Sequence, residues 1–374
     1  MKKKENQFQR RDRQTFDRAT RGESMAISGA PPVTTAQSGP KIPKKDPGEK
    51  IDMFCHILPR KYNDALLKMG NPCYYMKNAV RPPALFDLDI RFRAMDKYEG
   101  LRQLLNLGVP PIEYVVSPKD AVNLARMAND EMAELVSKYP DRFVGAVAGL
   151  PMNDVDASIR ETERAIKDLK FKGIQLYSSI NGKPLDRPEF LDIYEKMVQH
   201  DLPIWIHPSR DENIPDYPDE TFSKYGLFSK FAWPFETTMA MARLVFSGVM
   251  EKYPGLKIIS HHCGAMLPFF AGRVPEIPRQ PGEVVKLSKP PLEYFKKFYA
   301  DTVLAGNTAA LMFGYAFFGA DHMLFATDYP YPGGAELGDA AVGDVIKSVE
   351  LMKITDEERA KIFSKNARQI LGLS

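Results

Sequence analysis

The chain has little cysteine, no long hydrophobic run and little net charge. Its three cysteines among 374 residues, Cys55, Cys73 and Cys263, are too few and too scattered for a disulfide framework. No stretch approaches the roughly 18 apolar residues that a membrane-spanning helix needs. The formal net charge is only +3, from 51 basic and 48 acidic side chains, so a general nucleic-acid-binding surface is not expected. We therefore expect a protein of the reducing cytoplasm that binds neither nucleic acid nor membrane.

The first 50 residues differ from the remainder in charge and hydrophobicity. They contain 12 Lys and Arg against 6 Asp and Glu, so this segment carries +6 and the remainder −3. The segment has few apolar residues and no sustained period, so it cannot bury enough surface to fold alone. We expect residues 1–49 to be a flexible basic arm, either a solvated tail or a partner-docking segment, and residues 50–374 to fold as a separate domain.

From residue 50 onward, short apolar runs alternate with longer segments of helical periodicity. This alternation is typical of βαβ units and a parallel sheet. Eight candidate strands over about 300 residues favour a (β/α)8 TIM barrel over an open sheet. The predicted strands are residues 51–55, 112–116, 143–148, 173–177, 202–206, 256–260, 298–300 and 323–326. The predicted helices are residues 119–138, 157–169, 188–200, 236–252, 308–318 and 356–373, and the predicted long connections are residues 60–110 and 208–235.

Histidines and an aspartate follow several of the predicted strands directly. They are His56, His207, His261, His262 and Asp328. The carboxyl ends of all strands of a parallel barrel meet at one mouth, so these side chains are expected to converge there. Imidazole and carboxylate groups are the ligands that zinc and similar metals prefer. The sequence therefore predicts a metal centre at the mouth of the barrel.

The two remaining histidines provide a comparison. His200 lies at the end of a predicted helix, and His322 precedes its strand and so belongs to the opposite face of the barrel. An isolated histidine is more often a structural or solvated residue than a ligand. We expect such a role for both.

Five segments resemble sequence blocks of the amidohydrolase superfamily, in the amidohydrolase 2 branch that includes aminocarboxymuconate-semialdehyde decarboxylase and the hydroxybenzoate decarboxylases. The blocks are IDMFCHILP (51–59), YPDRFVG (139–145), WIHP (205–208), LKIISHHCGAMLP (256–268) and ATDYPYP (326–332). They occur in the family's order, and the resemblance covers about residues 50–372. It implies a barrel with one divalent metal, usually Zn²⁺ and in some relatives Mn²⁺. The activity that it implies is non-oxidative decarboxylation or, elsewhere in the superfamily, hydrolysis.

The resemblance also implies a role for individual residues. It makes His56, His207 and Asp328 the metal ligands, and His262 a catalytic residue together with Asp328. His262 is preferred to His261 because its spacing to Pro268 fits the family without a gap.

Two arginines complete the site that the resemblance implies. Arg81 resembles an arginine that holds a carboxylate of the substrate. Arg273 resembles an arginine that crosses a dimer interface into the neighbouring site. For each of them the alternative is an ordinary surface ion pair.

One position departs from the family pattern. The first histidine of the opening motif is replaced by Phe54, whose ring cannot bind a metal. Cys55 points to the opposite face of a regular strand and is no substitute. His56, His207 and Asp328 still provide three ligands and leave open positions, as catalytic metal sites require.

Three functions are compatible with these features. The first is a metal-dependent decarboxylase of an unsaturated or aromatic carboxylic acid, a small molecule, acting as a homodimer. The second is a hydrolase of a lactone or amide on the same scaffold. The third is a metal-free, inactive subunit that forms a hetero-oligomer with an active paralogue.

Overall fold

The computed structural model describes residues 48–71, 73–77, 81–274, 285–331 and 334–373. These residues belong to one compact unit. The arm predicted for residues 1–49 lies outside the described residues, apart from its last two. Within the described part of the chain, the longest apolar helices fall short of what is needed to cross a membrane.

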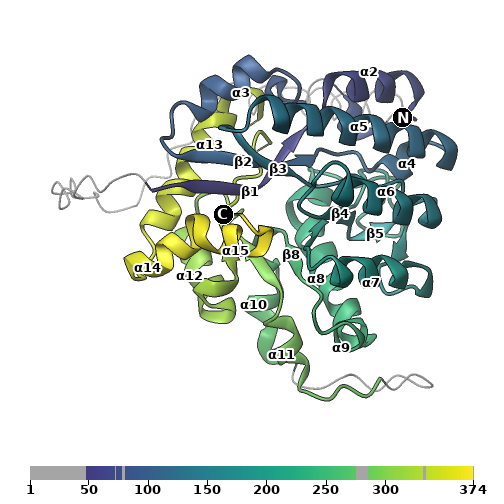
Figure 1. Cartoon of the computed structure of the whole chain (residues 1–374). Coiled ribbons are helices and arrows are strands. Elements are labelled where there is room, and N and C mark those ends of the chain that lie inside the picture. The colour runs from purple at the N-terminus through teal and green to yellow at the C-terminus, as the bar shows by residue number, and fades with distance from the viewer. Residues whose placement is uncertain (1–47, 72, 78–80, 275–284, 332–333, 374) are drawn as a thin grey trace, which may run out of the picture. The chain divides into compact units, whose positions relative to one another are not determined.

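Parallel strands form the centre of this unit, with helices around them (Figure 1). The strands pair in the orders β1-β2-β3 and β10-β9-β8-β7-β4. A parallel bridge from Ala148 to Ile174 joins the two groups at one side, and the amide of Met53 donates to the carbonyl of Phe325 at the other. The expected TIM barrel is therefore confirmed. Its strands are β1 (Lys50–Ile57), β2 (Leu101–Leu107), β3 (Phe143–Ala146), β4 (Ile174–Tyr177), β7 (Ile204–His207), β8 (Ile258–Ser260), β9 (Tyr299–Asp301) and β10 (Met323–Leu324).

The second strand is where the sequence prediction was wrong. Residues 112–116 were expected to be a strand, but they contain the short helix α4 (Ile112–Val115), and the strand is β2. Leu101, Leu104 and Leu105 follow a helical spacing and lack β-branching, although all three side chains are buried. Pro111 directly precedes α4 with a φ of −56°, which suits a helix start. The predicted connection over residues 60–110 therefore contains a strand.

Amphipathic helices cover the outside of the strands. In α5, Ser117 accepts a hydrogen bond from the amide of Asp120 at the N-terminus, and Leu124 and Met132 lie on the buried face. The helices are α2 (Arg60–Met69), α3 (Leu88–Met95), α4, α5 (Pro118–Lys138), α6 (Val155–Lys167), α7 (Leu191–Gln199), α8 (Trp233–Phe246), α9 (Val249–Lys252), α10 (Leu267–Phe270), α11 (Pro291–Phe295), α12 (Thr308–Phe318), α13 (Gly334–Glu350), α14 (Asp356–Ala360) and α15 (Asn366–Leu371).

Short elements complete the connections between strands and helices. The hairpin β5 (Ser179–Ile180) and β6 (Lys183–Pro184) is antiparallel. The other connections contain short 3₁₀ and π helices. They are η1 (Tyr74–Met76), η3 (Pro83–Leu85), η4 (Pro188–Phe190), η5 (Phe228–Ala232), η6 (His262–Gly264), η7 (Ala271–Arg273), η8 (Ala320–His322) and η9 (Lys361–Lys365).

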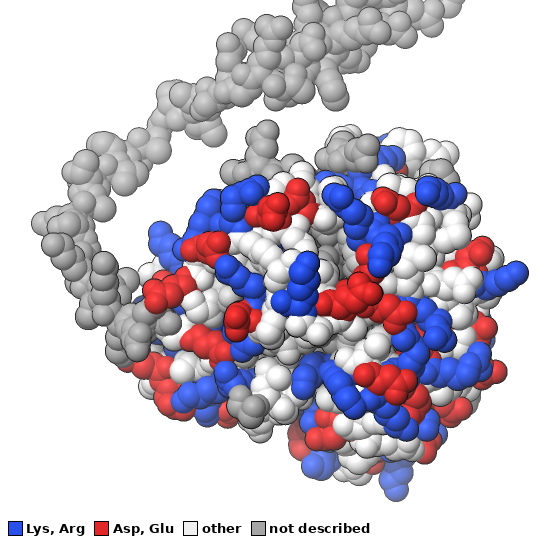
Figure 2. Space-filling model, turned by 45° about the horizontal axis from the view of Figure 1, so that its top comes forward, with Lys and Arg blue, Asp and Glu red and all other residues white. Residues whose placement is uncertain are grey.

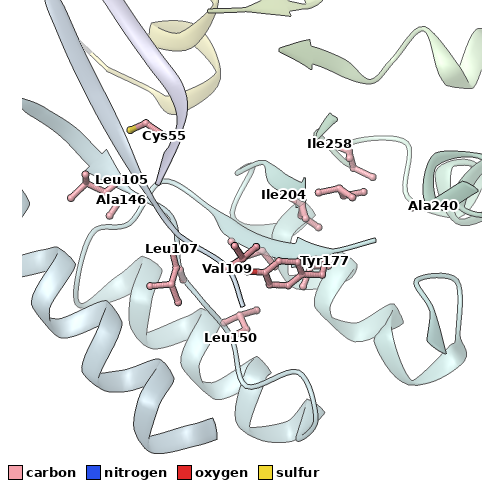
Figure 3. Close-up of a cluster of buried hydrophobic side chains, with 14 of the residues drawn as sticks. Cys55, Leu105, Leu107, Val109, Ala146, Leu150, Tyr177, Ile204, Ala240 and Ile258 are labelled. Carbon is pink, nitrogen blue, oxygen red and sulfur yellow. The ribbon is translucent and has the colours of Figure 1, made fainter. Parts of the chain in front are cut away.

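The hydrophobic core has two layers, as the alternation along each strand requires. One cluster lies between the strands and the helices and includes Cys55, Ile204 and Ile258 (Figure 3). The other includes Met53 and the fully buried Trp205, whose indole nitrogen donates to the carbonyl of Met53 at 2.8 Å. On the outer surface, Lys and Arg are interspersed with Asp and Glu over the face seen in Figure 2. The core thus fixes the strands, and their carboxyl ends carry the polar side chains described next.

Candidate metal centre

His56 lies near the carboxyl end of β1 with its ring inside the barrel. The strand is buried along its whole length, and both ring nitrogens of His56 are buried without an aligned hydrogen-bond partner. Burying polar atoms without partners is unfavourable, and native proteins leave few of them. The donor atoms of His56 are therefore available to a ligand that the chain itself does not supply.

His207 and His261 lie at the ends of β7 and β8 and approach His56. One donor nitrogen from each of the three histidines lies within 4.8 Å of the others, and all three side chains are buried. Burial, and after it the proximity of the rings of His56 and His261, lower the pKa of His207 well below its ordinary value. A neutral imidazole is the form that binds a metal ion. The three histidines can therefore hold one cation.

His261 is held by a carboxylate beneath it. Its Nδ1 lies 2.5 Å from Oδ2 of Asp301, at the end of β9, which leaves Nε2 buried and without a partner. Burial alone would lower the pKa of His261, but the charge and the hydrogen bond of Asp301, with a contribution from Asp328, raise it to about 9. This arrangement fixes the tautomer and the orientation of the ring that faces the other histidines.

Asp328 brings the carboxylate to the same place. Its Oδ1 lies 3.0 Å from Nε2 of His56 and 3.6 Å from Nε2 of His261. Burial raises the pKa of this carboxyl, but the hydrogen bonds and charges of His261 and His56 outweigh burial and hold the pKa well below its ordinary value. Asp328 therefore provides a negative charge beside the imidazole nitrogens.

The turn that carries Asp328 is attached to the first strand. Thr327 donates from its amide at 3.0 Å and from its hydroxyl at 2.5 Å to the carboxylate of Asp52, which is fully buried in β1. The amide of Asp328 donates to the carbonyl of Phe54 at 2.9 Å, and Asp328 itself has a φ of 60°. That left-handed conformation is uncommon outside glycine, so the contacts to β1 determine where this carboxylate points.

Phe54 occupies the space between the imidazole rings. Its ring centroid lies 4.2 Å from that of His261, 5.3 Å from that of His56 and 5.8 Å from that of His207. Cys55 points the other way and packs in the outer core, as expected, with its sulfur 3.2 Å from the carbonyl of Leu104. A histidine at position 54 would therefore meet the same centre.

His262 follows His261 directly but has a different environment. Its φ is 56°, its ring centroid lies 4.0 Å from that of His261, and its Nδ1 is buried without a partner. Burial, and after it the charge of His261, lower the pKa of His262 to about 3. The structure thus groups His261 with His56 and His207, and places His262 beside that group as a neutral ring.

The two predicted arginines differ sharply in burial. Arg81 is 8% exposed and donates to the amide oxygen of Asn63, while its Nε has no partner. Burial lowers its pKa, and Tyr331 and Tyr62 lie near enough to raise it in part. Since the ring of Tyr331 lies 5.2 Å from that of His56, Arg81 is close to the centre. Arg273 is exposed at the end of η7, and among the described residues it contacts none of the metal-centre side chains.

His200 and His322 lie apart from this centre. Nε2 of His200 lies 3.1 Å from Oε1 of Glu163, and Nδ1 of His322 lies 3.1 Å from the carbonyl of Phe298. Both rings thus satisfy their polar atoms with neighbouring groups, in keeping with the structural roles expected of them.

The sequence did not lead us to Asp301 or to its pairing with His261. A signal existed, because Asp301 directly follows the predicted strand of residues 298–300, just as Asp328 follows the last strand. A single carboxylate after a strand is common, however, and only the fold places it 2.5 Å from a particular histidine.

Known proteins resemble this chain over nearly all of its described length. The amidohydrolase family model, Amidohydro_2, matches residues 51–373. A curated relative, 2-amino-3-carboxymuconate-6-semialdehyde decarboxylase of Dictyostelium discoideum, is 30% identical over 342 residues, which are 87% of this chain and 92% of that protein. The chain therefore belongs to the amidohydrolase family, as the resemblance of its sequence blocks implied.

Solved structures give the same grouping. The structure of 5-carboxyvanillate decarboxylase from Sphingomonas paucimobilis matches with a TM-score of 0.75 and 26% identity, over 87% of this chain and 99% of that one. That of dihydroxybenzoic acid decarboxylase from Polaromonas sp., with bound manganese and the inhibitor 2-nitroresorcinol, matches with a TM-score of 0.69 and 28% identity, over 87% of this chain and 97% of that one. The proteins that share this barrel thus include decarboxylases of aromatic acids.

Proposed function

We propose that this protein is a metal-dependent non-oxidative decarboxylase of an unsaturated or aromatic carboxylic acid. The observation that carries the proposal is the convergence of His56, His207 and His261, with one donor nitrogen of each within 4.8 Å of the others, beside the carboxylate of Asp328. The decarboxylases among the relatives support the reaction class.

The residues of the centre fit a divalent cation. Nε2 of His56 and Nε2 of His261 are buried without an aligned hydrogen bond and lie 3.0 and 3.6 Å from Oδ1 of Asp328, and a cation among these atoms would satisfy them. We propose Zn²⁺ because the donor set is rich in imidazole, with Mn²⁺ as the alternative that the Polaromonas structure supports. His56, His207 and Asp328 would hold the ion, which when bound supplies Lewis acidity at the carboxylate of the substrate.

The chain's own side chains would bind the acid and move the proton. Arg81, which is buried and has no acidic partner among the described residues, would form a bidentate bridge to a second carboxylate of the substrate. As the bond between the carbon and the departing carboxylate breaks, the electron pair stays on the carbon and CO₂ leaves. That carbon takes up a proton, which we assign to a water molecule hydrogen-bonded to the ionised Asp328, so that Asp328 directs the transfer, while the neutral ring of His262 orients that water or accepts its hydrogen bond.

His261 is the competing candidate for that proton transfer. Its Nδ1 is held by Asp301, which leaves Nε2 facing Asp328 at 3.6 Å. Parallel kinetics of His261→Ala and His262→Ala separate the assignments. If His262 orients the water, its removal lowers kcat while metal content is retained, whereas removal of His261 lowers metal content as well.

A homodimer is proposed from an exposed aromatic surface. Phe269 and Phe313 are 72% and 49% exposed, and their rings lie 5.9 Å apart on the adjoining helices α10 and α12. Contiguous exposed apolar side chains of this kind often mark protein interfaces, and Arg273 follows α10 by only a few residues. A cytoplasmic location stays a proposal that the free thiols of Cys55, Cys73 and Cys263 support.

Metal analysis and product analysis test the proposed function together. Purified protein is expected to contain about one divalent ion per chain and to release CO₂ from at least one member of a panel of hydroxybenzoic and muconic acids. Incorporation of oxygen from labelled water without release of CO₂ would indicate a hydrolase instead. A folded protein without stoichiometric metal would favour the inactive subunit.

A further inference from the structure

A small cavity lies on the same face of the barrel as the metal centre, beside His207. Its volume is about 70 Å³, and we call it the acidic pocket. Its walls come from the segments that follow β1, β2, β4 and β7, and so from the carboxyl-end face where barrel enzymes place their sites. The side chains used in the argument below are Glu113, Asp211, Arg210, Val109 and Pro208.

Two carboxyl groups in the acidic pocket are buried without a complete set of partners. Glu113 is 4% exposed and its Oε1 has no hydrogen-bond partner. Asp211 is 5% exposed and its Oδ2 has none, although its other oxygen accepts from the amide and the side chain of Asn213. Buried carboxyl oxygens in this state are unfavourable unless a ligand satisfies them.

No cationic side chain of the described residues forms an ion pair with either group. Arg210 lines the acidic pocket, but its Nη1 lies 3.4 Å from Glu236 and its Nη2 donates to the carbonyl of Pro215 at 3.0 Å. Its two terminal nitrogens are therefore engaged elsewhere, while its Nε has no hydrogen-bond partner among the described residues and makes no ion pair with Glu113 or Asp211. The pocket has two acidic acceptors and lacks a positive charge directed at them.

The acidic pocket adjoins the metal centre. Pro208, in its wall, follows His207 directly in the chain, and the ring of Tyr177 lies 5.3 Å from that of His207. Tyr177 and the wall residue Val109 belong to the same buried hydrophobic cluster, in which both are labelled in Figure 3. Glu113 and Tyr177 line a neighbouring small cavity, so Tyr177 is close to both Glu113 and His207. A substrate held at the centre is thus within reach of the pocket.

We propose that the acidic pocket is a subsite for a primary ammonium group carried by the substrate acid, with Glu113 and Asp211 as its acceptors. The inference rests on the proposed function, because the centre is taken to hold the acid end. An ammonium group has three donors and a positive charge, and can satisfy both carboxyl groups together. A hydroxyl group has one donor and leaves the second carboxyl unpartnered.

Paired ligands that differ only at this group provide the test. The three positional isomers of aminomethylbenzoate are compared with the corresponding hydroxymethylbenzoates by titration calorimetry on the metal-loaded protein. At least one aminomethyl isomer is expected to bind about tenfold more tightly than its hydroxymethyl partner, as one charge-assisted contact provides. Glu113→Gln should reduce this preference to less than about threefold, and Asp211→Asn should reduce it in part. Binding of the hydroxymethyl compounds should change less in both variants than binding of their aminomethyl partners.

A control and a second assay keep the two proposals separate. Glu134→Gln removes a carboxylate that is 69% exposed on α5 and should leave the preference unchanged. Equal affinity for both members of every pair, or a preference that both pocket variants retain, would overturn the subsite, and release of CO₂ from benzoic acids without an amine would still support the decarboxylase. Conversely, an ammonium preference that depends on Glu113, without any CO₂ release, would leave the subsite standing and reject the decarboxylase.

Discussion

Nδ1 of His261 lies 2.5 Å from Oδ2 of Asp301, and the other oxygen of this carboxylate accepts from the amides of Cys263 and Val303 at 3.0 and 3.1 Å. One buried carboxylate thus orients the imidazole and also holds the backbone that follows β8 and the backbone that follows β9. Carboxylates behind metal-binding histidines typically raise metal affinity or activity 10- to 100-fold, roughly.

Asp301→Asn is therefore expected to lower kcat/KM by about 10- to 100-fold while the fold is retained. The amide keeps the shape of the side chain but removes the charge that fixes the His261 tautomer. Circular dichroism and steady-state kinetics check this, with Asp321→Asn as the control, because Asp321 is an exposed partner of Lys361. Unchanged kinetics for Asp301→Asn would show that the pair of Asp301 and His261 does not contribute to the reaction.

His207→Ala is expected to lower metal affinity by at least about 100-fold, since one of the three proposed ligands is removed. His200→Ala is the matched control, because His200 contacts Glu163 outside the centre. Metal content after dialysis, measured by inductively coupled plasma mass spectrometry, should fall only in the first variant. Equal metal content in both would show that the ion is held elsewhere.

Phe54→His is expected to tighten metal binding by at least about tenfold. The ring of Phe54 already lies between those of His56 and His261, so an imidazole there would add a fourth donor. Competition with a chelator measures the dissociation constant, and Phe54→Leu controls for loss of the aromatic ring. Weaker binding in Phe54→His would mean that the phenyl ring supports the centre by packing alone.

Glu113 gives a pH dependence of stability that does not rely on a substrate. Burial raises its pKa from 4.5 to about 8, and the neighbouring groups Tyr62 and Tyr177 are neutral at these pH values. Between these values the unfolded chain ionises Glu113 and the folded protein does not. The free energy of unfolding therefore falls as pH rises through this window and levels off above pH 8.

Glu113→Gln should remove this fall in the free energy of unfolding at high pH. Its free energy of unfolding is expected to exceed that of the natural protein by on the order of 2–4 kcal/mol at high pH, and to converge with it near the pH where both states hold the proton. Urea denaturation across the pH range measures the difference. The exposed Glu134→Gln should show none, and a constant offset in Glu113→Gln would contradict a titrating Glu113.

Arg81→Lys is expected to raise KM by about tenfold or more for acids with a second carboxylate, because a lysine cannot form the bidentate bridge. Acids with a single carboxylate should show little change, which makes them the internal control. Steady-state kinetics over both classes decides, and an equal rise in KM for both would assign Arg81 a role in folding or metal binding.

The sequence was sufficient to predict the barrel and the place of the centre, because both depend on local patterns. Apolar runs followed by His56, His207 and Asp328 mark strands that end in polar side chains. The hydrophobic periodicity did not predict the strand at Leu101–Leu107, because the leucines of this buried strand are spaced as in a helix. There the neighbouring strands, rather than local preference, determine the conformation.

The partners of individual side chains were beyond prediction. The choice between His261 and His262 depends on the backbone turn at residues 262–265. Three residues of this turn that are not glycine have a positive φ. No spacing rule encodes which of two adjacent rings such a turn directs inward. The pairing of Asp301 with His261 and the burial of Glu113 likewise depend on long-range packing.

The hydrogen bonds from Thr327 to Asp52 connect residues 275 positions apart. During synthesis, His56 leaves the ribosome early, whereas the segment that closes the barrel and delivers Asp328 emerges near the end. Contacts of such sequence separation form slowly and only when both segments are present. The complete set of ligands therefore forms late in biogenesis. A nascent chain halted before residue 328 would expose the histidines without the carboxylate of Asp328.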